Sequence, residues 1–152
     1  SFDQKMSKND EKNKKKNRDT EENLPAFFSR LEDACKGLFY ISEIDAPVEA
    51  FASKTVSFVG GDIVQQIAGK TDETIEEADF TKFFERLTAV KDWHGEQEKT
   101  RAKKFLDLQK LIEENLSNRK VFRIGDIRIR IYAVGLDSEG RLVGIKTNAV
   151  ET

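Results

Sequence analysis

The sequence predicts a single α/β domain in which helices pack on a mostly antiparallel sheet. Strand patterns cluster near the C-terminal end of the chain, and amphipathic helical patterns precede them. The chain has 152 residues, of which 38% are hydrophobic, and this is enough to bury one core without disulfides. The helices are therefore expected to cover the apolar faces of the strands.

The segment from 121 to 152 carries the clearest strand pattern. Apolar and polar side chains alternate along it, with the period of two that a half-buried strand requires. Gly140 can adopt the positive φ of a hairpin loop, so residues 137–140 are expected to turn the chain into a second strand through Leu142, Val143 and Ile145. In the first strand the predicted apolar side comprises Ile127, Ile129, Ile131 and Ala133, and the other side Arg128, Arg130 and Tyr132.

Helical periodicity precedes these strands. A first helix is expected from Asn23, a capping residue, to about Gly37, with Pro25 in its first turn. A second is expected after Asp79, and the longest from about 98 to 116, closed by Asn118. Their apolar faces comprise Phe27, Phe28, Leu31, Ala34, Cys35 and Leu38 in the first, Phe80, Phe83, Phe84 and Leu87 in the second, and Ala102, Phe105, Leu106 or Leu108, Leu111, Ile112 and Leu116 in the third.

The remaining segments are shorter. Residues 38–44 form an apolar passage interrupted by Ser42 and Glu43, which are expected at the mouth of a loop, and residues 48–51 suggest a strand. A short helix is expected after the pair Gly60 and Gly61, followed by a loop over 70–77 with a brief extended piece. Residues 1–22 mix acids, lysines and asparagines with almost no apolar side chains, which predicts a disordered tail before a domain spanning 23–152.

Composition bounds the function. A formal net charge of −2 does not indicate direct nucleic-acid binding, and no apolar run is long enough for a membrane span. The single cysteine, Cys35, gives no internal disulfide, so a cytoplasmic setting is expected. Cys35 is either a small buried thiol or a nucleophile with His94 as the one possible imidazole base. No triad, metal-ligand cluster or cofactor loop is recognisable, so neither an enzyme nor a bound cofactor is expected.

Several stretches resemble the nuclease A inhibitor family, whose members block a magnesium-dependent, sugar-non-specific DNA/RNA endonuclease. They are GLFYISEIDAP, DFTKFFERLTAVKDW, RIGDIRIRIYAVG and GRLVGIKTNAVET, which follow one another between about Leu31 and Thr152. The resemblance implies an α/β/α sandwich similar to the pathogenesis-related protein fold. It also implies a nuclease as the partner of a protein that is monomeric when free.

The resemblance assigns roles to three residues. Glu43 matches a glutamate that contacts the nuclease, although a solvated turn residue is the alternative from sequence alone. Trp93 matches a tryptophan near the nuclease-binding face, and it could instead fill a gap in the core. Thr152 matches a terminal threonine that bridges to the magnesium of the nuclease, whereas many terminal residues are simply frayed.

The sequence also departs from the family pattern. His94 stands where a tyrosine is expected, and Arg128 and Arg130 replace acidic or neutral residues on one sheet face. These changes keep a second hypothesis open, in which the chain is a non-enzymatic binding or structural module of the same fold with a different or lost target.

Overall fold

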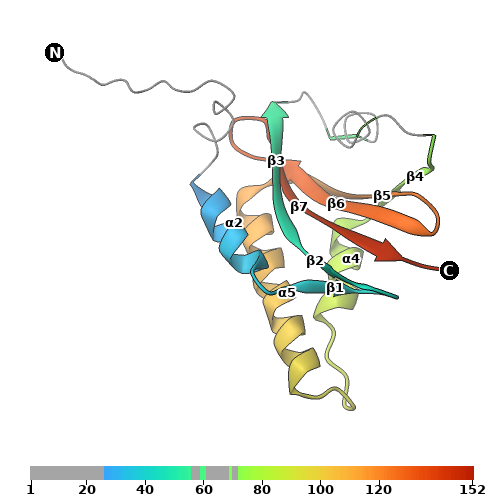
Figure 1. The fold of residues 1–152 in the computed structure, drawn as a ribbon. Helices are drawn as coiled ribbons and strands as arrows, with labels where there is room; N and C mark the ends of the chain where they lie inside the picture. The colour runs from blue at the N-terminus through green and yellow to red at the C-terminus, as the bar shows by residue number, and fades with distance from the viewer. Residues whose placement is uncertain (1–25, 56–58, 61–68, 70–71) are drawn as a thin grey trace.

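The computed structural model describes residues 26–55, 59–60, 69 and 72–152. Its largest element is an antiparallel five-stranded sheet in the order β3-β7-β6-β5-β4 (Figure 1). A separate two-stranded hairpin precedes it along the chain, formed by β1 (Phe39–Ile41) and β2 (Asp45–Pro47). The strands of the main sheet are β3 (Glu49–Thr55), β4 (Ile75–Ala78), β5 (Ser117–Ile124), β6 (Arg128–Leu136) and β7 (Arg141–Val150).

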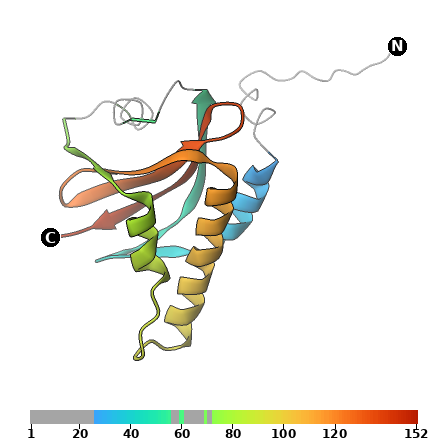
Figure 2. The same ribbon diagram turned by 180° about the vertical axis from the view of Figure 1, so that it is seen from behind.

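Three helices lie within the described residues: α2 (Phe27–Cys35), α4 (Phe80–Thr88) and α5 (Glu96–Asn115). All three cover one face of the sheet, as the view from behind shows (Figure 2). Asp79 caps α4 as predicted, because its Oδ2 accepts a hydrogen bond from Lys82 N at 2.9 Å. None of these helices combines the length and apolar character needed to cross a bilayer.

The sheet buries apolar side chains on both faces. The helix-facing core joins Leu31, Phe84 and Leu108 to alternate residues of β6 and β7, including Ile131 and Ile145. A second cluster occupies the opposite face. It comprises Val59, Phe122, Ile124, Tyr132, Val134 and Leu142. The mixed α/β class with a mostly antiparallel sheet is confirmed, and the described residues place helices on one face alone, so they do not confirm the α/β/α sandwich.

The strand predictions are largely confirmed. The turn at 137–140 joins β6 to β7, with Gly140 at φ 79° and Asp137 N donating to Arg141 O. Ile129, Ile131 and Ala133 are buried on one side of β6. One assignment in this region was wrong, because Ile127 lies before the strand and is 56% exposed. Tyr132 lies on the other side of β6 as predicted, and it is buried there in the second cluster. Because both faces of the sheet are covered, side chains on either side of β6 are buried, except near the ends of the strand.

Asn118 does not close the long helix as predicted. The helix ends at Asn115, and Asn118 lies inside β5, where the register with β6 shifts between Ser117 and Lys120. Its φ of 52° is left-handed, a conformation that asparagine tolerates better than most residues. The tail predicted over 1–22, the cap at Asn23, Pro25, and the short helix predicted after Gly60 and Gly61 lie outside the described residues.

Candidate functional site

The last three residues are held between two loops. On one side, Glu43 N donates to Val150 O at 3.2 Å, and Val150 N donates to Ser42 Oγ at 3.1 Å. On the other side, Glu151 N donates to Ile127 O at 2.9 Å. These bonds attach the chain after β7 to the tip of the β1–β2 hairpin and to the turn between β5 and β6. The segment is therefore fixed by contacts rather than frayed.

Gly125 allows that second turn to form. Its φ is +108°, a backbone conformation that residues other than glycine rarely adopt. A Cβ at this position would lie 2.3 Å from the carbonyl oxygen of Arg128. The turn therefore requires glycine, and it presents the Ile127 carbonyl to Glu151.

Glu43 and Thr152 meet directly, although 109 positions separate them in the sequence. One carboxylate oxygen of Glu43, Oε2, accepts the backbone N–H of Thr152 at 2.7 Å and its hydroxyl at 2.8 Å. Within the described residues the other oxygen, Oε1, accepts no hydrogen bond, and both residues are exposed. The structure thus brings together two of the residues that the sequence singled out.

The direction of the hydroxyl bond is fixed by chemistry. An ionised carboxylate only accepts hydrogen bonds, so the Thr152 hydroxyl must donate its proton to Glu43. The lone pairs of Thr152 Oγ1 are then left for another group. This pair therefore presents a hydroxyl oxygen as an acceptor, with a free carboxylate oxygen beside it.

The two bonds from Thr152 lower the pKa of Glu43 below its ordinary value, the backbone N–H having the larger effect and the hydroxyl the smaller. A lowered pKa means that the contribution of the contact is complete above the ordinary pKa and is lost as the pH falls through the lowered one. The attachment of Thr152 is therefore expected to weaken in acid.

We expect removal of Thr152 to return the pKa of Glu43 to its ordinary value, and Thr152→Val to return it only in part. A carboxyl-carbon NMR titration measures both. The pKa of Glu98 is the internal control, because it is lowered by bonds to its own backbone N–H and to that of Gly95. An unchanged Glu43 titration after removal of Thr152 would show that the contact does not form in solution.

Exposed apolar side chains surround this polar centre. Ile41 and Ile44 lie on the hairpin, and Ile127 lies beside Glu151. These exposed apolar side chains are available for contact with a partner. Sequence periodicity had assigned Ile127 to the core, and only its position in the turn before β6 distinguishes it.

Trp93 lies apart from this pair, in the loop between α4 and α5, which Figure 1 shows at the end of the helices remote from α2. It is 73% exposed, so it does not fill a gap in the core. His94 fixes the loop, because its Nδ1 accepts the backbone N–H of Lys91 at 2.9 Å, and its ring lies 4.2 Å from that of Trp93. His94 and Ile41 line one hollow, so the loop and the hairpin border a common surface.

Trp93→Ala is expected to leave the melting temperature nearly unchanged, since this side chain buries little surface in the free protein. If Trp93 anchors the partner, the same change should weaken binding by about 2 kcal/mol or more. Calorimetric titration with the partner and a thermal melt measure the two effects. Val90→Ala is the matched control, because Val90 is exposed in the same region. A large drop in melting temperature with unchanged affinity would contradict the anchor role.

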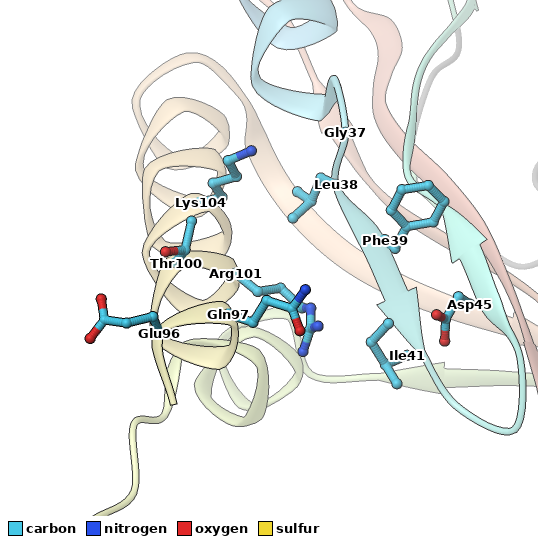
Figure 3. A pocket seen from close by; sticks show the side chains of 10 residues that line it. All are labelled: Gly37, Leu38, Phe39, Ile41, Asp45, Glu96, Gln97, Thr100, Arg101 and Lys104. Carbon is cyan, nitrogen blue, oxygen red and sulfur yellow. The ribbon is translucent and has the colours of Figure 1, made fainter. Parts of the chain in front are cut away.

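A groove lies between α5 and the hairpin (Figure 3). Its volume is about 480 Å³, and its lining includes Phe39, Ile41, Thr100, Arg101 and Lys104. Figure 3 shows Gln97 and Arg101 reaching toward β1. Neither Glu43, Trp93 nor Thr152 lines it. The three candidate residues therefore lie on the exposed surface, outside this groove.

Cys35 is a core residue. It is buried on α2, and burial, followed by the negative charges of Glu32 and Glu49, raises the pKa of its thiol to about 12. Since the thiolate is the nucleophilic form, such a thiol is inert at neutral pH. Of the two interpretations of Cys35, the small buried thiol is the one that the structure supports.

The fold and the site describe a domain that holds Glu43 and Thr152 together on its exposed surface. A family model, described as nuclease A inhibitor-like protein, matches residues 26–152. The chain belongs to the nuclease A inhibitor-like family, as the sequence resemblance predicted. Membership implies a nuclease inhibitor, a non-enzymatic protein whose partner is a nuclease. Comparison with curated proteins gives no match.

Proposed function

We propose that the protein inhibits a magnesium-dependent, sugar-non-specific nuclease by placing Thr152 and Glu43 in its active site. The observation that carries this proposal is the pair of hydrogen bonds that the backbone N–H and the hydroxyl of Thr152 donate to Glu43 Oε2. Magnesium prefers oxygen ligands and usually retains several waters. The free lone pairs of Thr152 Oγ1 can accept a hydrogen bond from such a water or bind the ion directly, where a scissile phosphate would otherwise lie.

The charge of the surrounding surface supports this role. Glu43 and Glu151 are exposed beside Thr152, and Glu151 is paired with Arg123 while Glu43 is bonded to Thr152. An active site that binds phosphates is cationic, so the exposed Glu43 carboxylate complements it. Glu43 Oε1 is free to accept a hydrogen bond from a cationic side chain of the nuclease, while Oε2 holds Thr152.

The departures from the family pattern affect this surface less than the sequence suggested. Arg130 Nη2 lies 3.2 Å from Glu73 Oε1, and His94 orders the Trp93 loop. Arg130 and His94 therefore make contacts within the domain. Arg128 is exposed at the start of β6, and it is the departure that could change the choice of nuclease.

The test is an inhibition assay with the full chain against nuclease A and other sugar-non-specific, magnesium-dependent nucleases, on both DNA and RNA. Stoichiometric inhibition of at least one nuclease, with equal effect on the two substrates, is expected. The protein alone should cleave neither nucleic acid. If no nuclease of this class is inhibited or bound, the proposed function is wrong and the alternative of a binding module with another target replaces it.

A further inference from the structure

We propose that Arg123 is a positioning residue: it fixes Glu151 and thereby the direction in which Thr152 points. This inference rests on the proposed function and adds a residue that contacts neither Thr152 nor, by this account, the nuclease. Sequence periodicity gave no reason to single out Arg123, since it is one of several arginines that alternate with apolar residues on the late strands.

The position of Arg123 in the sheet explains its reach. It lies on β5, opposite Glu76 of β4 and Ile131 of β6. Its Nη2 donates to Glu151 Oε1 at 2.7 Å, and its Nε lies 3.7 Å from Glu76 Oε1. The Arg123 side chain is 16% exposed, whereas those of Glu76 and Glu151 are 70% and 46% exposed. The guanidinium is thus held by the sheet, and Glu151 extends to it from the surface.

Tyr40 of the hairpin lines the same hollow as Arg123 and Glu151. Burial by itself lowers the pKa of Arg123, but the hydrogen bond and charge of Glu151 and the hydroxyl of Tyr40 outweigh burial, so the pKa is raised. Tyr40 is buried on β1, the strand that leads to Ser42 and Glu43. The Arg123 guanidinium therefore lies at a hollow that the hairpin carrying Glu43 also borders, and it is bonded to the segment that carries Thr152.

The segment after β7 needs such a contact. The ladder with β6 ends at Val150, and the backbone of Glu151 then makes one bond, from its N–H to Ile127 O. A charged hydrogen bond from a half-buried arginine is shorter and stronger than a neutral one, and its geometry is directional. With Glu151 fixed on one side, Thr152 is left facing Glu43. Without it, Glu43 alone would have to order the last residue.

Arg123→Gln is expected to weaken inhibition of nuclease A, or of whichever nuclease the assay identifies, by about tenfold, the effect of losing one charged hydrogen bond. In the Thr152→Val background the same change should cause almost no further loss, because Arg123 acts through Thr152. Arg123→Lys should recover part of the inhibition. Lys120→Gln is the matched control: Lys120 lies on the same strand and pairs with Glu77 of β4 at 3.5 Å, away from Glu151.

A second measurement needs no nuclease. In the free protein, Arg123→Gln should raise the amide exchange rate of Thr152 and lower its backbone order parameter, while Lys120→Gln should change neither. Unchanged Thr152 dynamics, or losses of inhibition that multiply fully in the double variant, would overturn the positioning role. If the unsubstituted protein inhibits no nuclease, the proposed function fails, and the dynamics of Thr152 still decide whether Arg123 positions it.

Discussion

Replacing Thr152 with valine is expected to weaken inhibition by about 30-fold or more, with the melting temperature unchanged. The change keeps the shape of the side chain and removes the oxygen whose lone pairs face the partner. Truncating one partner of a buried polar contact at an interface costs about 2 to 5 kcal/mol, and each 1.4 kcal/mol is a factor of ten. The inhibition constant at fixed magnesium concentration measures the loss.

Two variants isolate the hydroxyl. Thr152→Ser retains Oγ, so its inhibition is expected to stay within a few-fold of the unsubstituted protein, the range of a lost methyl contact. Thr100→Val makes the same exchange at an exposed threonine on α5, where no effect on inhibition is expected. Equal inhibition by Thr152→Val and the unsubstituted protein would remove the hydroxyl from the mechanism.

Phe84→Ala is expected to lower the free energy of unfolding by about 3 to 5 kcal/mol. Phe84 is fully buried under the sheet, and its ring lies 4.8 Å from that of Phe80 and 5.4 Å from that of Phe83. Truncation leaves a cavity where α4 meets the core, and neighbours on a helix and a sheet close it only in part. Because a typical domain is stable by about 5 to 15 kcal/mol, this is a large fraction of the whole.

Chemical denaturation measures this loss. Phe39→Ala is the matched control, since Phe39 is 42% exposed on the hairpin and its truncation should cost about 1 kcal/mol or less. A similar loss for the two variants would contradict the placement of Phe84 in the helix-facing core.

Local patterns predicted the elements that depend on local chemistry. The cap at Asp79, the turn before β7 and the apolar stripes of α4 and α5 all follow from residue spacing, and the structure confirms them. Asn118 was misplaced, and the burial of Tyr132 was not predicted, because their environments depend on distant segments. Asn118 lies at a register shift against β6, and Tyr132 is buried by Phe51 from β3, whose ring lies 5.3 Å away.

In the candidate site, too, single residues could be predicted from the sequence, whereas the contacts between them could not. The resemblance nominated Glu43, Trp93 and Thr152 one at a time, and their roles toward a nuclease stay predictions. The contact between Glu43 and Thr152 could not be predicted, because it requires the register that places the end of β7 beside the hairpin. Arg123 was missed for the same reason, since its proposed positioning role depends on a hydrogen bond to Glu151, which is 28 positions away in the sequence.

The most direct test of the account is the magnesium dependence of binding. The affinities of the unsubstituted protein and of Thr152→Val for a catalytically inactive nuclease are compared by calorimetry, each with and without Mg²⁺. If Thr152 Oγ1 completes the metal's coordination or binds one of its waters, magnesium should tighten binding of the unsubstituted protein by about tenfold or more and that of Thr152→Val by much less. An equal magnesium effect on both proteins would contradict the claim that Thr152 acts at the metal.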